Sequence, residues 1–457
     1  MTRFCLILLF IAALLPWTSP VQAQQAATDP QPHLLIIIAD HLTLADFHRP
    51  DCPNLLSATQ YGQSALMSPG LAHGADPVSD VYATFGAGDT IRKGEILQGS
   101  LADTLRGAHI SFTTIGDADG DDTGIFRPVD LFLPGAPHLT GGFTRDPLAP
   151  GGMRCDAPLL SDLSKSALLV NDLVVVHDGD FARLERENRA GILTPAAYAA
   201  HRRRALMRLD DFAGEVQEPS PSISNNFPVQ VFFLVPCGPL DSNGQWDRLT
   251  PFIRLPGRGR VHLLTSDTTQ TTGIVAARDI APTILAEFSL PLPVTMTGAS
   301  IHDDASWTIL ERLDRLTYLN QKIQLPFFWG LGVLGGGLVF FAVWFYLATR
   351  IEPRPLARRV LQFGVRMLAA WPLALLIAPL SVPPVLPVQT LAQYLAAIFL
   401  VTALIALLPS PGKIAIATAG VLIVDAACGT SLISQSALSA YYLSGIRFYG
   451  IGNESMG

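Results

Sequence analysis

Four aspartates in the first half of the chain share one feature: each lies at the end of an apolar run of strand length. They are Asp40, Asp117, Asp178 and Asp180. Where such runs form neighbouring parallel strands, ligands bind at the carboxyl ends of those strands. Carboxylates gathered there can hold a divalent cation, because oxygen ligands suit hard cations. The alternative is that each aspartate caps the following helix or shapes a turn.

The apolar runs predict the elements that would position these carboxylates. Continuous apolar runs are expected for parallel strands that are covered on both faces. They occupy residues 34–40, 111–117, 173–180 and 229–236. The helical spacing of Leu206, Leu209 and Phe212 predicts a helix within 201–216. The predicted fold class is therefore α/β, with a mostly parallel sheet and helices on both of its faces.

The amino-terminal residues predict export. Arg3 precedes a short apolar run, and a small-x-small cleavage motif follows at Val21-Gln22-Ala23, so residues 1–23 are expected to be a signal peptide. An uncleaved anchor is the alternative, but the apolar run is shorter than the ~20 residues that span a bilayer. Export leads to an oxidising compartment. The exported domain would carry three cysteines, which permit at most one internal disulfide: Cys52, Cys155 and Cys237.

The carboxy-terminal third predicts an all-α multispan membrane region. Residues 326–349 contain no charge and would extend ~36 Å as a helix. Three further spans are expected within 367–431, and the arginine-rich segment 350–366 is expected to be a cytoplasmic loop. Residues 24–325 would then lie outside a bacterial-type cytoplasmic membrane. Residues 432–457 are expected to form a glycine- and aromatic-rich segment at the outer face, beyond which the natural chain continues.

Three stretches resemble the alkaline phosphatase superfamily, which includes sulfatases, phosphoglycerate mutases and lipid-headgroup phosphotransferases. LLIIIADHLT resembles the first strand with its metal-binding aspartate, here Asp40. LVVVHDGDFARL resembles a later strand that would supply Asp178 or Asp180 to the metal centre. TTGIVAARDIAPTILAEFSLPLPVTMTGASI resembles the closing segment, in which Asp279 is expected to cap a helix. The resemblance extends over residues 34–301 and implies a two-metal mechanism.

The resemblance also implies a nucleophile at the start of the helix that follows the first long loop. The matching stretch is HGADPVSDVYATFGAGDT, in which Ser79 and Thr84 are the candidate nucleophiles. Gly86 and Gly88 would allow a close approach of the backbone. In the family's mechanism the nucleophile attacks phosphorus or sulfur while the metals stabilise the entering and leaving oxygens. The alternative is that these hydroxyls belong to a turn of small residues and have no catalytic role.

The chain departs from the family where further metal ligands are expected. Active members carry an Asp-His pair after the strand that corresponds to 229–236, but here the strand runs into Pro236-Cys237-Gly238-Pro239. The expected closing histidine is replaced by Thr265-Ser266-Asp267. Imidazole ligands of zinc are hard to replace by Thr or Cys, so a two-zinc site is predicted to be lost. One divalent cation (Mg, Mn, Ca or Zn) could still be held by four candidate ligands: Asp40, Asp178, Asp180 and Asp267.

We therefore expect a membrane-anchored cell-envelope protein whose degenerate outer domain binds or scaffolds rather than hydrolyses. The alternative is an active metal-dependent phosphohydrolase or phosphotransferase acting on lipid-linked or cell-wall phosphoesters. A third class is transport through the spans, for which Asp425 and Arg447 are the ionisable candidates. Nucleic acid is not an expected partner, because the basic stretch at 201–208 is followed at once by Asp210 and Asp211 and is predicted to be a solvated helix face. The sequence predicts no particular protein partner.

Overall fold

The computed structural model describes most of the predicted outer domain and part of the carboxy-terminal third. The described stretches are residues 33–70, 77–90, 101–116, 127–217, 229–239, 249–255, 262–269, 271–304, 355–377 and 391–427, with single positions at 313–314, 332, 336–337, 340, 343–344, 347 and 432. Several predictions lie outside the described residues: the signal peptide 1–23, Asp117, Arg447, and nearly all of 326–349 and 432–457.

Strands and helices alternate along residues 33–304, as the apolar runs predict. The strands are β1 (His33–Ala39), β2 (Gln63–Ser68), β3 (Phe112–Ile115), β4 (His138–Leu139), β5 (Phe143–Arg145), β6 (Met153–Cys155), β7 (Leu173–Asp178), β8 (Val229–Leu234), β9 (Thr250–Leu255), β10 (Leu263–Ser266), β11 (Ile274–Ala276) and β12 (Ile301–Asp304). The helices are α2 (Leu44–Phe47), α3 (Pro53–Tyr61), α4 (Pro77–Ala87), α5 (Leu101–Gly107), α6 (Val129–Phe132), α7 (Ala157–Leu168), α8 (Asp180–Arg189), α9 (Pro195–Gln217) and α11 (Ile280–Glu287), with short 3-10 turns η1 (Pro150–Gly152) and η2 (Ala277–Asp279).

Ten strands form one sheet in the order β12-β10-β2-β9-β8-β1-β7-β3-β4, with β11 paired to β2. The pairs β1–β7, β1–β8, β3–β7, β3–β4, β2–β10 and β2–β11 are parallel. The pairs β8–β9, β2–β9 and β10–β12 are antiparallel. The prediction of a mostly parallel sheet is therefore confirmed, and the antiparallel strand β9 lies between its two parallel parts. A separate small sheet pairs β5 with β6.

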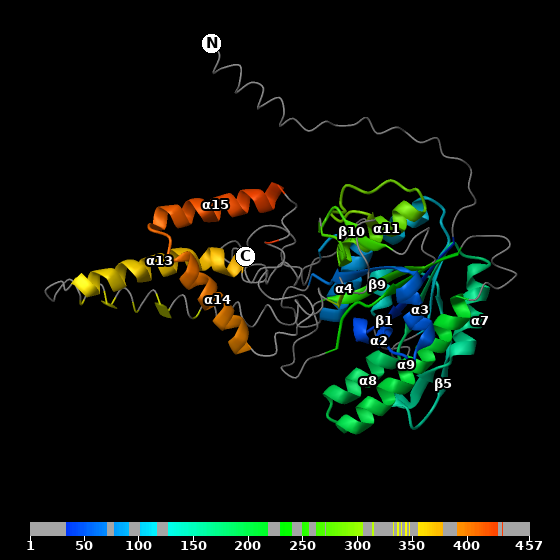
Figure 1. The fold of residues 1–457 in the computed structure, drawn as a ribbon. Helices are drawn as coiled ribbons and strands as arrows, with labels where there is room; N and C mark the ends of the chain where they lie inside the picture. Colours follow the sequence, from blue (N-terminus) through cyan, green and yellow to red (C-terminus); the bar gives the residue numbers. More distant parts are fainter. Residues whose placement is uncertain are drawn as a thin grey trace, which may run out of the picture. The chain divides into compact units, whose positions relative to one another are not determined.

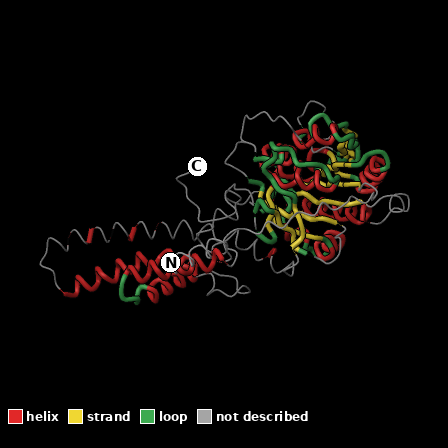
Figure 2. Tube along the Cα trace, turned by 90° about the horizontal axis from the view of Figure 1, so that it is seen from above, coloured by secondary structure: helices red, strands yellow, loops and turns green. Residues whose placement is uncertain are grey.

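Helices cover both faces of the sheet, and this explains the unbroken apolar runs. Along β1, Leu34, Ile36 and Ile38 belong to one buried cluster, which includes side chains of α4, α5 and α11. Their neighbours Leu35 and Ile37 belong to the other cluster, which includes side chains of α3, α7 and α9. Figures 1 and 2 show the strands lying between these helices. Side chains alternate across a strand, so a strand that is buried on both faces is apolar at every position.

The carboxy-terminal residues contain three described helices, α13 (Pro355–Ile377), α14 (Leu391–Ile405) and α15 (Pro411–Ala427). Residues 355–366, which the sequence analysis assigned to a loop, form the first half of α13. In the part of the chain that the structure describes, no helix is both long enough and apolar enough to cross a bilayer. The multispan region therefore stays a prediction.

Candidate functional site

The register of the three central strands brings the candidate aspartates to one edge of the sheet. Ala39, at the end of β1, pairs with Asp178 at the end of β7, and Ile38 pairs with His177. Ile38 also pairs with Leu234, at the end of β8. These strands lie side by side in the order β8-β1-β7. Asp40, Asp178 and the loop after β8 therefore meet at the carboxyl end of the sheet, where ligands bind in this type of fold.

The carboxylate of Asp40 is buried and accepts hydrogen bonds from groups of the protein itself. The Tyr82 hydroxyl, from α4, donates to Asp40 Oδ2 at 3.1 Å, and His177 Nε2 lies 3.2 Å from the same oxygen. The Cys237 thiol lies 3.8 Å from Oδ1. Burial by itself raises the pKa of Asp40, but the hydrogen bond and charge of His177, with smaller contributions from His41 and Tyr82, outweigh it and leave the pKa below the ordinary 3.8. Groups of the protein itself thus favour the ionised form of Asp40.

The loop that follows β8 packs on His41. The N–H of His41 donates to the Cys237 carbonyl at 2.7 Å, and His41 Nδ1 lies 3.2 Å from the Gly238 carbonyl and 3.5 Å from the Cys237 sulfur. His41 has a φ of 60°, in the left-handed region. Burial lowers the pKa of His41, against the opposing charge of Asp40. Burial raises the pKa of Cys237 well above its ordinary value, so its thiol is protonated.

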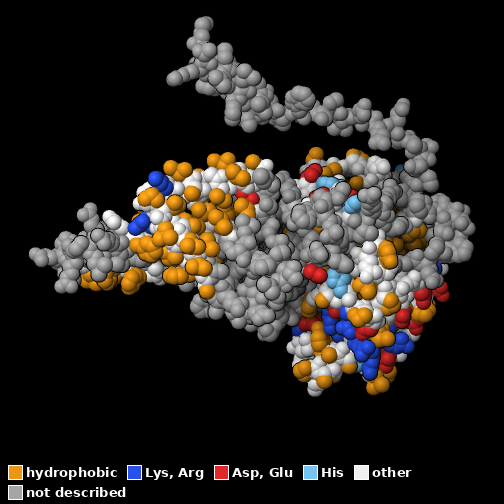
Figure 3. Space-filling model, in the orientation of Figure 1, with side chains coloured by type: hydrophobic (Ala, Val, Ile, Leu, Met, Phe, Trp, Pro, Cys, Tyr) orange, Lys and Arg blue, Asp and Glu red, His pale blue; other side chains and the backbone are white. Residues whose placement is uncertain are grey.

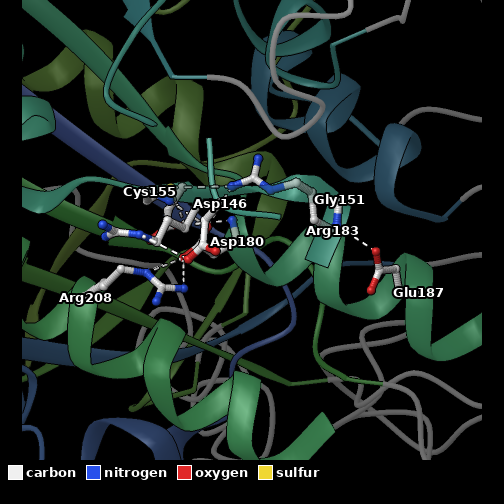
Figure 4. A network of polar contacts seen from close by, with 9 residues as sticks. Asp146, Gly151, Cys155, Asp180, Arg183, Glu187 and Arg208 are labelled. Carbon is white, nitrogen blue, oxygen red and sulfur yellow. Dashed lines mark hydrogen bonds and ion pairs between the residues drawn. The ribbon is translucent and has the colours of Figure 1, made fainter. Parts of the chain in front are cut away.

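Both carboxylate oxygens of Asp180 accept hydrogen bonds from arginine. Arg183 Nη2 donates to Oδ1 at 2.7 Å, and Arg208 donates to Oδ2 through Nε at 2.8 Å and through Nη2. The Cys155 N–H also donates to Oδ1, at 2.8 Å. Figure 4 shows the two guanidinium groups reaching Asp180 from α8 and from α9, with Cys155 beside them. The side chains of Asp180 and Arg183 are only 3% and 2% exposed, so this pair lies away from solvent screening.

Asp178 lies next to this ion pair and contacts the same residue, Cys155, through a different donor. Its Oδ1 accepts from the Cys155 thiol, with 3.1 Å between sulfur and oxygen, and from the Asp180 N–H at 2.9 Å. Burial raises the pKa of Asp178 to about 6, and the charge of Asp180 acts in the same direction. Burial also raises the pKa of the Cys155 thiol well above 9.0, and both neighbouring carboxylates add to this effect. The thiol is therefore a donor at neutral pH.

The side chains of Cys155, Asp178 and Asp180 are close enough to ligate one ion, since their ligand atoms lie within 4.8 Å of one another. It is the one such group of His, Cys, Asp and Glu in the described residues. A metal would require Cys155 as thiolate and at least one free oxygen on Asp180. Burial favours the protonated form of the Cys155 thiol by raising its pKa, and both oxygens of Asp180 accept hydrogen bonds from guanidinium groups. The residues present therefore do not fit a bound cation in this arrangement.

Asp267, the fourth candidate ligand, is not gathered with the others. It is exposed and directly follows β10, and three strands separate β10 from β1 in the sheet. At 4.7–4.9 Å per strand, this order places the two strands roughly 19 Å apart. The structure thus brings Asp178 and Asp180 together, places Asp40 at the end of the neighbouring strand, and leaves Asp267 outside this group.

The hydroxyl groups on either side of Asp267 donate hydrogen bonds to another carboxylate, that of Asp279. Asp279 is buried, and its oxygens accept from the hydroxyls of Ser266 and Thr268, both at 2.6 Å. They also accept from the N–H groups of Ala276 at 2.8 Å and Ala299 at 3.1 Å. Asp279 is at the predicted N-cap position of α11, but its side chain makes no capping bond to that helix. Its carboxylate instead joins β10, η2 and the closing segment.

The two candidate nucleophiles lie on α4 at different depths. Ser79 is half-buried in the first turn, whereas Thr84 lies five residues later and is buried, and Tyr82 between them reaches Asp40. Gly86 allows α4 to pack closely against the backbone at Phe132, since a Cβ on Gly86 would come within 2.4 Å of the Phe132 carbonyl. Gly88 has a φ of 62° and accepts, through its carbonyl, the N–H groups of Thr297 and Gly298.

Five polar residues that contact the candidate aspartates were not predicted from the sequence. They are Tyr82, Cys155, His177, Arg183 and Arg208. One of them had a local signal, because Arg183 lies three residues after Asp180 on a helix, where side chains are neighbours. The other contacts join residues 23 or more positions apart, and no short-range pattern marks them.

The sequence matches no protein-family model and no curated protein. Solved structures of the alkaline phosphatase superfamily are similar to this chain at low identity. One is a protein in this superfamily from Vibrio parahaemolyticus, 11% identical, covering 60% of this chain and 70% of its own, with a TM-score of 0.42. A second is a 2-O GAG sulfatase, 12% identical, covering 59% and 73%, with a TM-score of 0.42. A third is the integral membrane protein lipooligosaccharide phosphoethanolamine transferase A from Neisseria meningitidis, 13% identical, covering 68% and 63%, with a TM-score of 0.39.

Proposed function

We propose that residues 33–304 form a degenerate alkaline phosphatase-like domain that binds or scaffolds a cell-envelope component and does not hydrolyse esters. The observation that carries this proposal is the pairing of Asp180 with Arg183 and Arg208. Where the resemblance implies a metal ion, this chain presents two guanidinium groups. The contacts of Asp40 with Tyr82 and His177 support the same conclusion at the neighbouring strand.

The chemistry of ester hydrolysis in this superfamily depends on cations that stabilise the entering and leaving oxygens. A cation at Asp180 would have to displace a buried arginine, and removing one partner of a buried ion pair costs ~3–5 kcal/mol. Arginine itself cannot activate a hydroxyl by accepting its proton, because its pKa lies above ~12. The two guanidinium groups therefore neutralise Asp180 and hold β6, β7, α8 and α9 together, and neither of them acts as a base or replaces the Lewis acid.

The component that the domain binds would belong to the envelope, as a lipid-linked or cell-wall molecule. This part of the proposal rests on the expected signal peptide and membrane region. It places residues 24–325 on the extracytoplasmic side of the membrane, within reach of both classes of molecule.

An active metal-dependent enzyme is the second candidate, and the proximity of Cys155, Asp178 and Asp180 favours it. With Cys155 deprotonated and Asp180 released, these groups would hold one divalent cation. When bound, the ion would polarise a phosphoryl or sulfuryl oxygen. Ser79, in the first turn of α4, would then be the candidate nucleophile.

Metal content and ester hydrolysis, measured together on the full-length protein, separate the two candidates. The chain is purified without chelator, bound divalent metal is determined by mass spectrometry, and aryl phosphates and sulfates are tested with added Mg, Mn, Ca or Zn. We expect no bound metal and no turnover, and co-sedimentation with isolated cell-wall polymer or with vesicles carrying lipid-linked precursors.

The matched variants are Asp180→Asn, within the ion pair, and Asp211→Asn, an exposed aspartate on α9. Stoichiometric metal that is lost in Asp180→Asn and kept in Asp211→Asn would overturn the proposal. Turnover that is lost in Ser79→Ala would then establish the enzyme.

A further inference from the structure

The hairpin of α8 and α9 ends in an exposed segment without charge. Residues 190–200 read AGILTPAAYAA and connect the last residue of α8 to the first two turns of α9. Most of these residues are exposed, and Ile192 is 68% exposed. A large aliphatic side chain at the tip of a helical hairpin loses the benefit of burial unless something covers it.

Arginines outnumber acidic residues around this uncharged tip: residues 186–204 contain five arginines and one acidic residue, Glu187. Between Arg189 and Asp210 the chain contains no Asp or Glu. Four exposed arginines lie on the two helices: Arg186, Arg189, Arg203 and Arg204. Figure 3 shows basic side chains gathered where Figure 1 places α8 and α9, with acidic and hydrophobic side chains among them.

Two of these arginines form ion pairs that keep their guanidinium groups partly exposed to solvent. Arg189 Nε lies 3.6 Å from Glu185, and Arg203 Nε lies 3.1 Å from Asp51, with arginine side chains 43% and 63% exposed. The Arg203–Asp51 pair lies at the surface and contributes little to stability, since water and salt screen it, whereas the Glu185 side chain is only 3% exposed. A phosphate group can therefore replace or share the carboxylate partner of Arg203.

The inner face of the hairpin is firmly packed, so the tip is presented by a rigid element. On α9, three apolar side chains belong to the buried cluster that α9 shares with α3 and α7: Leu206, Leu209 and Phe212. Arg202 donates to Asp46 at 2.6 Å, and Arg208 donates to Asp180. The exposed apolar tip is thus not a frayed terminus, and its exposure is a property of the fold.

We propose that the tip of the α8–α9 hairpin, residues 186–204, docks on an anionic lipid bilayer. An uncharged tip that enters the headgroup boundary, flanked by arginines at the level of the phosphates, has the composition of an interfacial element. Charge complementarity favours anionic lipid, with a gain of about fivefold in partitioning per arginine near the surface. The docking would fix the orientation of the domain on the membrane, which goes beyond the proposed binding of an envelope component.

The test places a spin label on the tip of the full-length protein through Ile192→Cys. Vesicles of phosphatidylcholine are compared with vesicles that also contain phosphatidylglycerol, and the label's accessibility to oxygen and to an aqueous nickel chelate is measured. The matched control is Val294→Cys, at an apolar residue outside the hairpin that is 101% exposed. The unsubstituted chain, labelled in parallel, corrects for native thiols.

We expect the label at 192 to become accessible to oxygen and protected from nickel in anionic vesicles, while the label at 294 stays accessible to water. Adding Arg186→Gln and Arg204→Gln to the labelled chain should reduce this protection about 25-fold in terms of partitioning, since each arginine contributes about fivefold. Equal exposure of the two labels to nickel in anionic vesicles would overturn the proposal. Equal protection at 192 in vesicles of phosphatidylcholine alone would also overturn it, because the tip would then not recognise anionic lipid.

Discussion

Two buried carboxylates of the domain, those of Asp279 and Asp180, accept hydrogen bonds from different kinds of donor. At the closing segment, Asp279 accepts from two hydroxyls and two backbone N–H groups, which are all neutral. At the carboxyl end of β7, Asp180 accepts from two guanidinium groups. Neutral donors leave the pKa of Asp279 above its ordinary value, because burial outweighs them.

The difference reflects two roles: Asp279 holds a local segment together, whereas Asp180 lies where a cation would be bound. The partners of Asp279 lie within 20 residues of it in sequence, so one local segment builds its own anchor. Arg208 reaches Asp180 from another helix, 28 residues away. Because an arginine from another helix helps to neutralise Asp180, removing this ion pair should destabilise more of the domain than removing a donor to Asp279.

The largest effect is expected from Arg183→Ala, which leaves Asp180 without one of its two cations. The Arg183 side chain is 2% exposed, so the remaining carboxylate would stay buried and only partly compensated. The free energy of unfolding should fall by about 3–5 kcal/mol, as measured by chemical denaturation.

Arg204→Ala is the matched control, because Arg204 is exposed on α9 and should change the stability by less than ~0.5 kcal/mol. If both substitutions have the same small effect, the ion pair does not hold the domain together, and the contrast with Asp279 fails.

A smaller effect is expected from Asp279→Asn, and its size should depend on pH. The amide cannot accept from all four donors, and an unsatisfied buried N–H costs about 1–3 kcal/mol. Because burial raises the pKa of Asp279 above 3.8, the folded chain binds this proton more tightly than the unfolded chain. The carboxyl therefore favours folding most below pH 3.8, and this contribution is lost as the pH rises through the folded pKa.

Asn does not titrate, so the stability difference between the two proteins should be largest below pH 3.8 and should decrease toward neutral pH. Urea denaturation of both chains at a series of pH values measures it. A difference that grows with pH would mean that donors, rather than burial, determine the ionisation of Asp279.

Much of the fold could be predicted because local patterns of apolar residues determine its strands and helices. The runs at 34–40, 173–180 and 229–236 became β1, β7 and β8, since strands buried on both faces must be apolar throughout. The helical spacing within 201–216 became α9, which is longer than predicted because its exposed first turns carry no apolar stripe. The antiparallel strand β9 was not predicted, as pairing direction is decided by partners far along the chain.

The candidate site could be predicted only in part, for a related reason. The ends of β1 and β7 supplied the positions of Asp40, Asp178 and Asp180. What those side chains do depends on Tyr82 and Arg208, which come from helices whose packing is set by the core. Position could thus be derived from strand ends, whereas the identity of the hydrogen-bond donors could not.

The smallest effect is expected from Asp267→Asn, which sharpens the comparison between the two carboxylates. Asp267 is exposed between two residues, Ser266 and Thr268, whose hydroxyls serve Asp279. Removing its charge should alter the free energy of unfolding by less than ~0.5 kcal/mol and leave metal content unchanged. If Asp267→Asn instead lowers the amount of bound metal, the closing segment contributes a ligand after all. The neutral hydroxyls around Asp279 would then belong to a site that a cation completes, and the two carboxylates would have to be regarded as parts of one site.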